Sequence, residues 1–114
     1  ALNTAFILDM MFAVQPDIKT VGLLYSRSEV NSETPIAQAK EYLDAKGVKY
    51  IEKTGNTTDE VLSAASELAE RCDAVFTPTD NVVMAAESAV AEILNEAGVP
   101  QLHGAGRKDR RNGL

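Results

Sequence analysis

The chain has 114 residues, of which 45% are hydrophobic and 25% are charged, and its formal net charge is −6. This length suits a single domain with one core, and the composition is typical of a folded globular protein rather than a disordered or fibrous one. Residues 107–111 carry a net charge of +3, so the residues before them carry −9. An acidic body repels nucleic acid and anionic membranes, which argues against both as partners. No apolar stretch approaches the ~20 residues that cross a bilayer.

Two residues that often carry chemistry have simpler interpretations here. Cys72 is the only cysteine, which excludes an internal disulfide and a multi-cysteine metal site. It ends a helical stretch, so we interpret it as a small core residue rather than a reactive thiol. His103 has no second ligand at metal spacing, so we interpret it as a strand-end histidine and expect no metal.

The predicted elements alternate between helix and strand. Apolar residues recur at helical spacing in four segments, whereas four shorter segments are rich in β-branched and other apolar residues, as expected of strands. In chain order, the elements are a helix over residues 2–14, a strand over 19–26, a helix over 31–47, a strand over 48–51, a helix from Thr57 or Thr58 to Cys72, a strand over 73–77, a helix over 82–97 and a strand over 99–103.

Local signals support several of these boundaries. Pro35 fits the first turn of a helix, and Gly47 and Gly98 are suited to end helices because glycine readily takes the left-handed conformation found there. Thr57 and Glu60 have the spacing of a capping box, in which each side chain accepts a hydrogen bond from a backbone N–H at the start of the helix. The helix starts and stops therefore agree with the apolar periodicity.

The order of the elements predicts the fold class. Each connection between successive strands contains a helix, so the strands should be parallel and the helices should cover both faces of the sheet. We therefore predict an α/β fold, a three-layer sandwich with a parallel four-stranded sheet of the flavodoxin-like or Rossmann-like kind. No internal repeat or low-complexity linker divides it.

The candidate site lies in three polar connections that follow the first three strands. In an open parallel sheet, ligands bind beyond the carboxyl ends of the strands, where the strand order reverses. Asn31 and Ser32 lead into a helix N-terminus, which favours a carboxylate or phosphate. The Asp80 carboxylate could hold an ammonium group beside the Asn81 amide. The candidate ligand-binding residues are Tyr25, Ser28, Asn31, Ser32, Thr57, Thr79, Asp80 and Asn81.

Helix capping is the competing interpretation of these residues. Asn31, Ser32, Thr57 and Asp80 are all ordinary N-cap residues, and capping explains them without a ligand. Tyr25, at the end of a strand, suits the core or its rim as well as a stacking surface for a ligand. The residues alone leave both interpretations open.

Enzymatic function finds little support in the sequence. There is no glycine-rich dinucleotide or phosphate loop, no nucleophile elbow, and no serine or cysteine with a suitably placed histidine. We therefore expect no cofactor and no catalysis. A small flavodoxin-like enzyme or nucleotide-binding domain is the alternative, and it would need a phosphate or flavin at the same edge of the sheet.

The order and spacing of the motifs resemble those of a known family. Residues 15–17 (QPD), 21–26 (VGLLYS), 28–32 (SEVNS) and 78–81 (PTDN) are similar to motifs of ABC-transporter substrate-binding proteins of the tryptophan/tyrosine type. The resemblance covers about residues 2–100. Each motif alone is modest, but their shared order is fairly specific.

The resemblance implies a lobe of a type I periplasmic-binding protein. In that fold two α/β lobes close on a ligand, often an aromatic amino acid, and present it to an ABC permease. It implies that Asn31 and Ser32 face the ligand carboxylate and that Asp80 faces its amino group. It also implies an extracytoplasmic location, periplasmic or as a membrane-anchored lipoprotein, and a second lobe that supplies part of the pocket. A dimer through the face that meets this lobe is a further expectation.

The last residues depart from the family pattern. After Pro100 the family continues with an acidic strand and loop, whereas residues 101–114 are rich in glycine and arginine. We therefore expect the α/β lobe to comprise residues 1–106 and residues 107–114 to form a basic tail that is disordered or non-native.

Overall fold

A computed structural model describes residues 4–27, 33–78 and 81–103. The elements are α1 (Thr4–Val14), β1 (Thr20–Tyr25), α2 (Glu33–Lys46), β2 (Lys49–Thr54), α3 (Thr58–Arg71), β3 (Ala74–Thr77), α4 (Asn81–Ala85), α5 (Glu87–Ala97) and β4 (Gln101–His103). Among the described residues, no helix is both long and apolar enough to cross a membrane.

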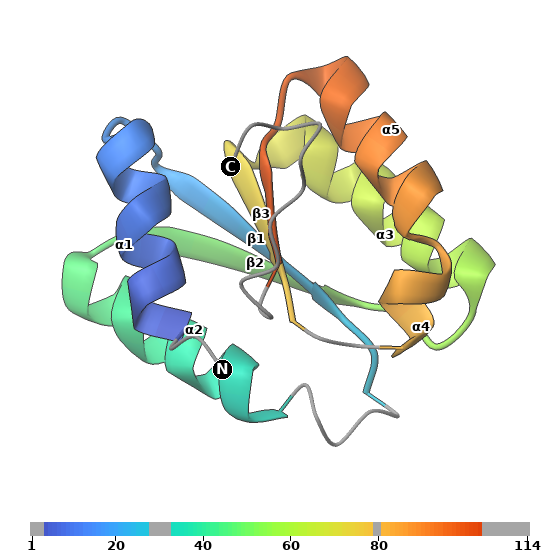
Figure 1. Cartoon of the computed structure of the whole chain (residues 1–114), viewed down its shortest axis with the longest axis horizontal. Coiled ribbons are helices and arrows are strands. Elements are labelled where there is room, and N and C mark those ends of the chain that lie inside the picture. Colours follow the sequence, from blue (N-terminus) through green and yellow to red (C-terminus); the bar gives the residue numbers. More distant parts are fainter. Residues whose placement is uncertain (1–3, 28–32, 79–80, 104–114) are drawn as a thin grey trace.

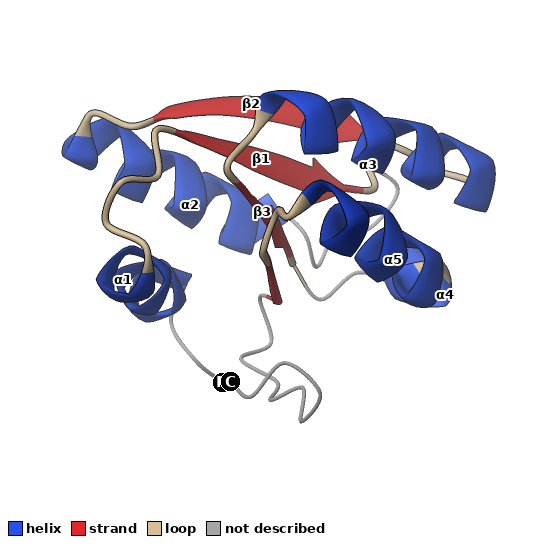
Figure 2. Cartoon of the chain, turned by 90° about the horizontal axis from the view of Figure 1, so that it is seen from above, coloured by secondary structure: helices blue, strands red, loops and turns tan. Residues whose placement is uncertain are grey.

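The four strands form one parallel sheet in the order β2-β1-β3-β4. Helices α1 and α2 cover one face, and α3, α4 and α5 cover the other, so the molecule has three layers (Figures 1 and 2). The predicted α/β sandwich with a parallel four-stranded sheet is confirmed. The chain leaves β1 toward β2 and later returns to the other side of β1 to form β3. The strand order therefore reverses between β1 and β3, which is where open α/β sheets bind ligands.

Alternate residues of the central strands divide the core into two clusters, because successive side chains of a strand point to opposite faces. Val21, Leu23 and Phe76 pack with α1 and α2, and Leu24 and Val75 pack with α3 and α5. All five side chains are fully buried. The nearly continuous apolar sequence of these strands thus follows from their having a helical layer on each side.

One predicted helix, over residues 82–97, is wrong in its continuity. The structure breaks it at Ala86, whose backbone N–H bonds to the Val83 carbonyl three residues back instead of four. The break lets α4 and α5 turn separately onto the sheet, so Val83, Ala86 and Val90 are all buried. Gly98 does end α5 in the left-handed conformation with φ 74°, as predicted.

The second strand is longer than residues 48–51, because polar residues extend it to Thr54. Glu52 and Lys53 point to opposite faces and each forms an ion pair with the helix on its side, Glu52 with Lys40 at 2.8 Å and Lys53 with Glu67 at 2.9 Å. An edge strand tolerates such residues since its faces are only partly covered. The end of this edge strand is therefore held to the helices on both faces by ion pairs rather than by apolar contacts.

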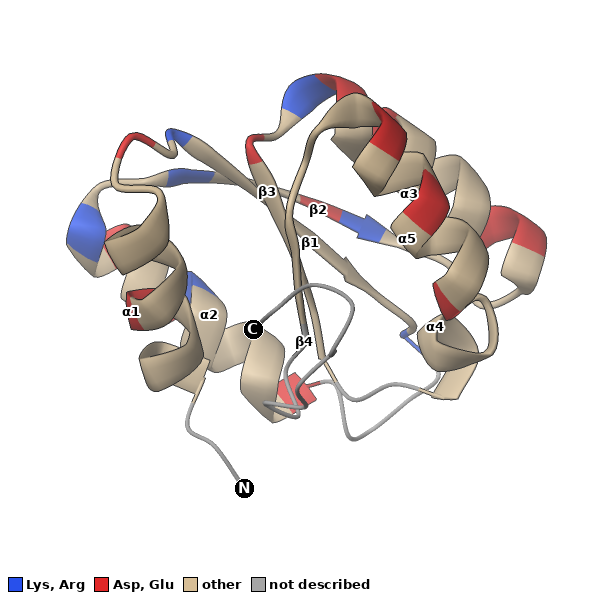
Figure 3. Ribbon diagram, turned by 45° about the horizontal axis from the view of Figure 1, so that its top comes forward, with Lys and Arg blue, Asp and Glu red and all other residues tan. Residues whose placement is uncertain are grey.

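Charge and exposure differ among the helices. Asp and Glu residues recur along α3 and α5, in agreement with the acidic body deduced from composition (Figure 3). Helix α1 instead exposes an apolar stripe of Phe6, Met10 and Val14, which are 51%, 44% and 70% exposed. These residues recur every four positions, so they lie along one side of the helix.

Candidate functional site

The carboxyl ends of three strands meet at one edge of the sheet. Tyr25, the last residue of β1, is level with Thr54, the last residue of β2, and Leu23 is level with Phe76 near the end of β3. The connections that follow these strands therefore begin side by side. We call this edge the carboxyl rim and define its described residues as Ser26, Arg27, Gly55, Asn56, Thr57, Pro78 and Asn81.

The structure describes only some of the predicted site residues. Ser28, Asn31, Ser32, Thr79 and Asp80 lie outside the described residues. Tyr25, Thr57 and Asn81 are described, and each lies at or next to the carboxyl end of a different strand. The structure therefore brings these three candidates to one rim, and their roles toward a ligand remain predictions.

Tyr25 is held in the α2 layer through its hydroxyl. The ring is half-buried against the core beneath α1 and α2, and the hydroxyl donates to the Glu52 carboxylate at 2.6 Å. Burial and the bond to Glu52 raise the pKa of Tyr25 to about 12. Partial burial alone would raise the pKa of Glu52, but hydrogen bonds from Lys40 and Tyr25 outweigh it and hold that pKa below its usual value. The phenol is therefore a protonated anchor for the end of β1.

Alkaline unfolding should report this anchor. Tyr25 ionises in the folded chain near pH 12 and at the ordinary value of 10 when unfolded, so the unfolded state loses protons first as the pH rises. The stabilising contribution is complete below pH 10 and is lost between pH 10 and about 12. Tyr42 follows the same course, because burial and its bond to Asp9 also raise its pKa to about 12. Urea unfolding across this range should show a shallower decline for Tyr25→Phe than for wild type. Equal slopes would contradict the anchor.

Thr57 caps α3. Its hydroxyl accepts from the Glu60 N–H at 3.2 Å, which confirms the predicted capping box in part. The Glu60 carboxylate reaches back to the Asn56 N–H at 2.8 Å, one residue before the cap. Capping thus occupies the Thr57 hydroxyl with a backbone group, and the same network fixes the backbone of Asn56.

Asn56 is a rim residue that the sequence analysis did not select. The buried hydroxyl of Ser26 donates to its side-chain oxygen at 3.0 Å, and the neighbouring Gly55 N–H donates to the Tyr25 carbonyl at 3.1 Å. These bonds join the first two polar connections. The signal available in the sequence was an asparagine directly before a capping box.

Cys72 is a buried residue of the core. Burial first, and the nearby Asp73 carboxylate second, raise the pKa of the Cys72 thiol to about 11, which disfavours the reactive thiolate form. Within the described ranges, no three His, Cys, Asp or Glu side chains gather as a metal site would require. The side chain of His103 lies outside the description.

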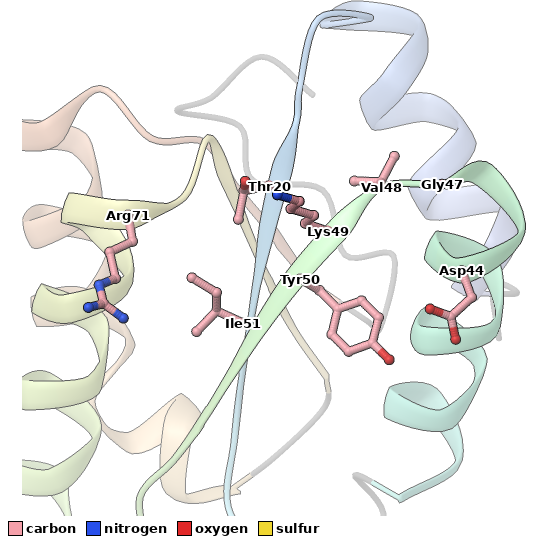
Figure 4. Close-up of a pocket in the computed structure, with 8 residues that line it drawn as sticks. All are labelled: Thr20, Asp44, Gly47, Val48, Lys49, Tyr50, Ile51 and Arg71. Carbon is pink, nitrogen blue, oxygen red and sulfur yellow. The ribbon is translucent and has the colours of Figure 1, made fainter.

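Two surface hollows lie at the opposite edge of the sheet, near the amino ends of the strands. One is lined by residues that include Thr20, Lys49 and Arg71, and the other by residues that include Cys72 and Asp73. In the first, Ile51 and Arg71 lie on one side of β2 while Tyr50 and Asp44 lie on the other, so the side chains do not converge (Figure 4). Asp73 accepts from the backbone N–H groups of Lys19 and Thr20, a role in holding strands together.

The comparisons with known proteins all lead to the same family. Residues 7–107 match the family model described as ABC transporter substrate binding protein. A "Tyrosine-binding protein" of Clostridioides difficile (strain R20291) is 30% identical over 93 residues, which are 82% of this chain and 27% of that protein. The chain thus spans about a third or less of the length of its relatives.

Solved structures agree. A ligand-free, open structure of a substrate-binding protein with adhesive properties from Clostridium difficile has a TM-score of 0.79 at 34% identity, and the match covers 84% of this chain and 32% of that one. An ABC domain in complex with L-Trp from Streptococcus pneumonia has a TM-score of 0.82 at 26% identity, over 88% and 34% of the two chains. The chain therefore belongs to the family of ABC transporter substrate-binding proteins.

Proposed function

We propose that this chain is one lobe of a two-lobed protein that captures an amino acid, aromatic in character, for an ABC importer. The observation that carries the proposal is the convergence of three polar connections at the carboxyl rim of a sheet whose chain belongs to this family. The aromatic character follows from the relatives, one of which is named for tyrosine and another of which holds L-Trp.

The lengths of the relatives support a second lobe. Each is about three times as long as this chain, and one is described as open when ligand-free. Binding free energy would go into stabilising a closed arrangement of two lobes, which an ABC permease recognises. We assign residues 1–106 to this lobe and residues 107–114 to a tail outside it.

The roles of the rim residues follow from their chemistry. Asn31 and Ser32, ahead of α2, would donate to the ligand carboxylate, and the Asp80 carboxylate, ahead of α4, would hold its ammonium group. Ser28, Thr57, Thr79 and Asn81 would line the same rim, and Tyr25 would close it from the α2 side. Such a site binds without transforming its ligand. An extracytoplasmic location, with a lipid anchor in the longer protein, suits this function.

Calorimetric titration of the two-lobed protein with L-Phe, L-Tyr and L-Trp tests the proposal. Wild type should bind at least one of them, and Asp80→Ala should weaken binding about 10-fold to 100-fold because a charged hydrogen bond is lost. Asp44→Ala is the matched control, since Asp44 is exposed at the opposite edge of the sheet. Unchanged binding in Asp80→Ala would remove Asp80 from the site, and no binding by wild type would refute the function.

A further inference from the structure

Asn56 presents a hydrogen-bond donor in a fixed orientation at the carboxyl rim. Its backbone N–H bonds to Glu60 at 2.8 Å, and the adjacent Gly55 N–H bonds to the Tyr25 carbonyl at 3.1 Å. Asn56 is thus tied to α3, and its neighbour Gly55 is tied to β1. A side chain on such a backbone is positioned before any ligand arrives, which lowers the entropic cost of binding.

Ser26 sets the orientation of the Asn56 amide. The Ser26 side chain is fully buried, and its hydroxyl donates to the Asn56 oxygen at 3.0 Å. A carboxamide has an acceptor end and a donor end, so the bond to the oxygen turns the NH2 group away from Ser26. Within the described part of the chain, no group accepts a hydrogen bond from that NH2, and Asn56 itself is exposed.

We infer that Asn56 binds a carboxylate oxygen of the ligand through its side-chain NH2 and that Ser26 positions it. The inference rests on the proposed function and adds a residue to that site. The exposed end of Asn56 can only donate, so it suits the carboxylate of an amino acid and not its ammonium group. The α3 N-terminus beside it adds a partial positive charge, although the carboxylates of Asp59 and Glu60 in the first turn offset part of this.

Exchanging the donor for a negative charge tests the assignment. Asn56→Asp preserves size and leaves an oxygen for Ser26, but it places a carboxylate opposite the ligand carboxylate. Binding of L-tryptophan should weaken about 30-fold, whereas binding of L-tryptophanamide, which lacks that charge, should change less than about 3-fold. Calorimetric titration of the two-lobed protein measures both affinities.

The outcomes separate the inference from the proposed function. If wild type binds neither compound, the function and the inference both fail. If wild type binds and Asn56→Asp weakens both compounds equally, Asn56 has only a structural role; if binding of both improves, Asn56 faces the ammonium group. Either result overturns the inference alone.

Two further variants test the positioning role. Asn56→Ala should weaken L-tryptophan about 10-fold, as expected for one lost hydrogen bond to a charged group. Ser26→Ala should weaken it about 3-fold to 5-fold, and this effect should disappear when Asn56 is already alanine. Additive effects in the double variant would show that Ser26 does not act through Asn56.

Discussion

Replacing Phe76 by alanine should destabilise the chain by about 4 kcal/mol, the largest effect we expect from a single substitution. Phe76 lies in β3, in the middle of the sheet, and its side chain is fully buried in the cluster beneath α1 and α2. Its removal leaves a cavity that the surrounding strands can fill only in part. Urea unfolding followed by circular dichroism measures the loss.

Phe6 offers the matched control for this experiment. It is also a phenylalanine, but it is 51% exposed on the outer side of α1. Phe6→Ala should cost less than about 1 kcal/mol, because little buried surface is lost. Similar losses at Phe6 and Phe76 would contradict the placement of the core between the sheet and α1.

Gly55→Ala should destabilise the chain by about 3 kcal/mol, because the added methyl group meets backbone atoms. A Cβ at this position would lie 2.7 Å from the Val61 nitrogen and 2.8 Å from the Glu60 carbonyl carbon. Relief of the clash requires the start of α3 to move away from β2. The same movement should disturb Asn56, so ligand binding should weaken along with stability.

Gly22→Ala and Gly98→Ala are controls that separate the steric clash at Gly55 from other costs of replacing glycine by alanine. The nearest atoms to a Cβ at Gly22 would be side-chain atoms of Leu68 and Cys72, at 3.1 Å and 3.2 Å, which can shift slightly. A Cβ at Gly98 would meet nothing within 4 Å, although the backbone φ of 74° is strained for alanine. Both variants should cost about 1 kcal/mol. A loss at Gly55 no greater than at Gly98 would refute the close approach of α3.

Apolar periodicity and turn residues were sufficient to predict the parallel sheet and the layers of helices. Gly47 and Gly98 both have the positive φ expected of residues that end helices. The break at Ala86 could not be predicted, because alanine carries no local signal and the interruption depends on how α4 and α5 each pack on the sheet. Glu52 and Lys53 extend β2 through ion pairs with helices distant in sequence, which periodicity does not register.

The shared edge of the three polar connections could be predicted from the sequence, whereas the contacts of their residues could not. Parallel strands require that connections after β1, β2 and β3 share an edge, so the rim followed from the order of elements alone. Three-dimensional contacts decide which polar groups of the rim are already hydrogen-bonded within the protein. Thr57 is used by the α3 cap and the Tyr25 hydroxyl by Glu52, whereas Asn56 keeps a donor that only its bond to Ser26 reveals.

The central claim is that ligand binds at the carboxyl rim, and amide chemical shifts of the 15N-labelled chain test it most directly. Addition of L-tryptophan should shift the resonances of Arg27, Asn56 and Asn81, which lie after three different strands at one edge of the sheet. Resonances of Thr20, Lys49 and Arg71, at the opposite edge, should remain in place. Shifts confined to those three residues would contradict the account.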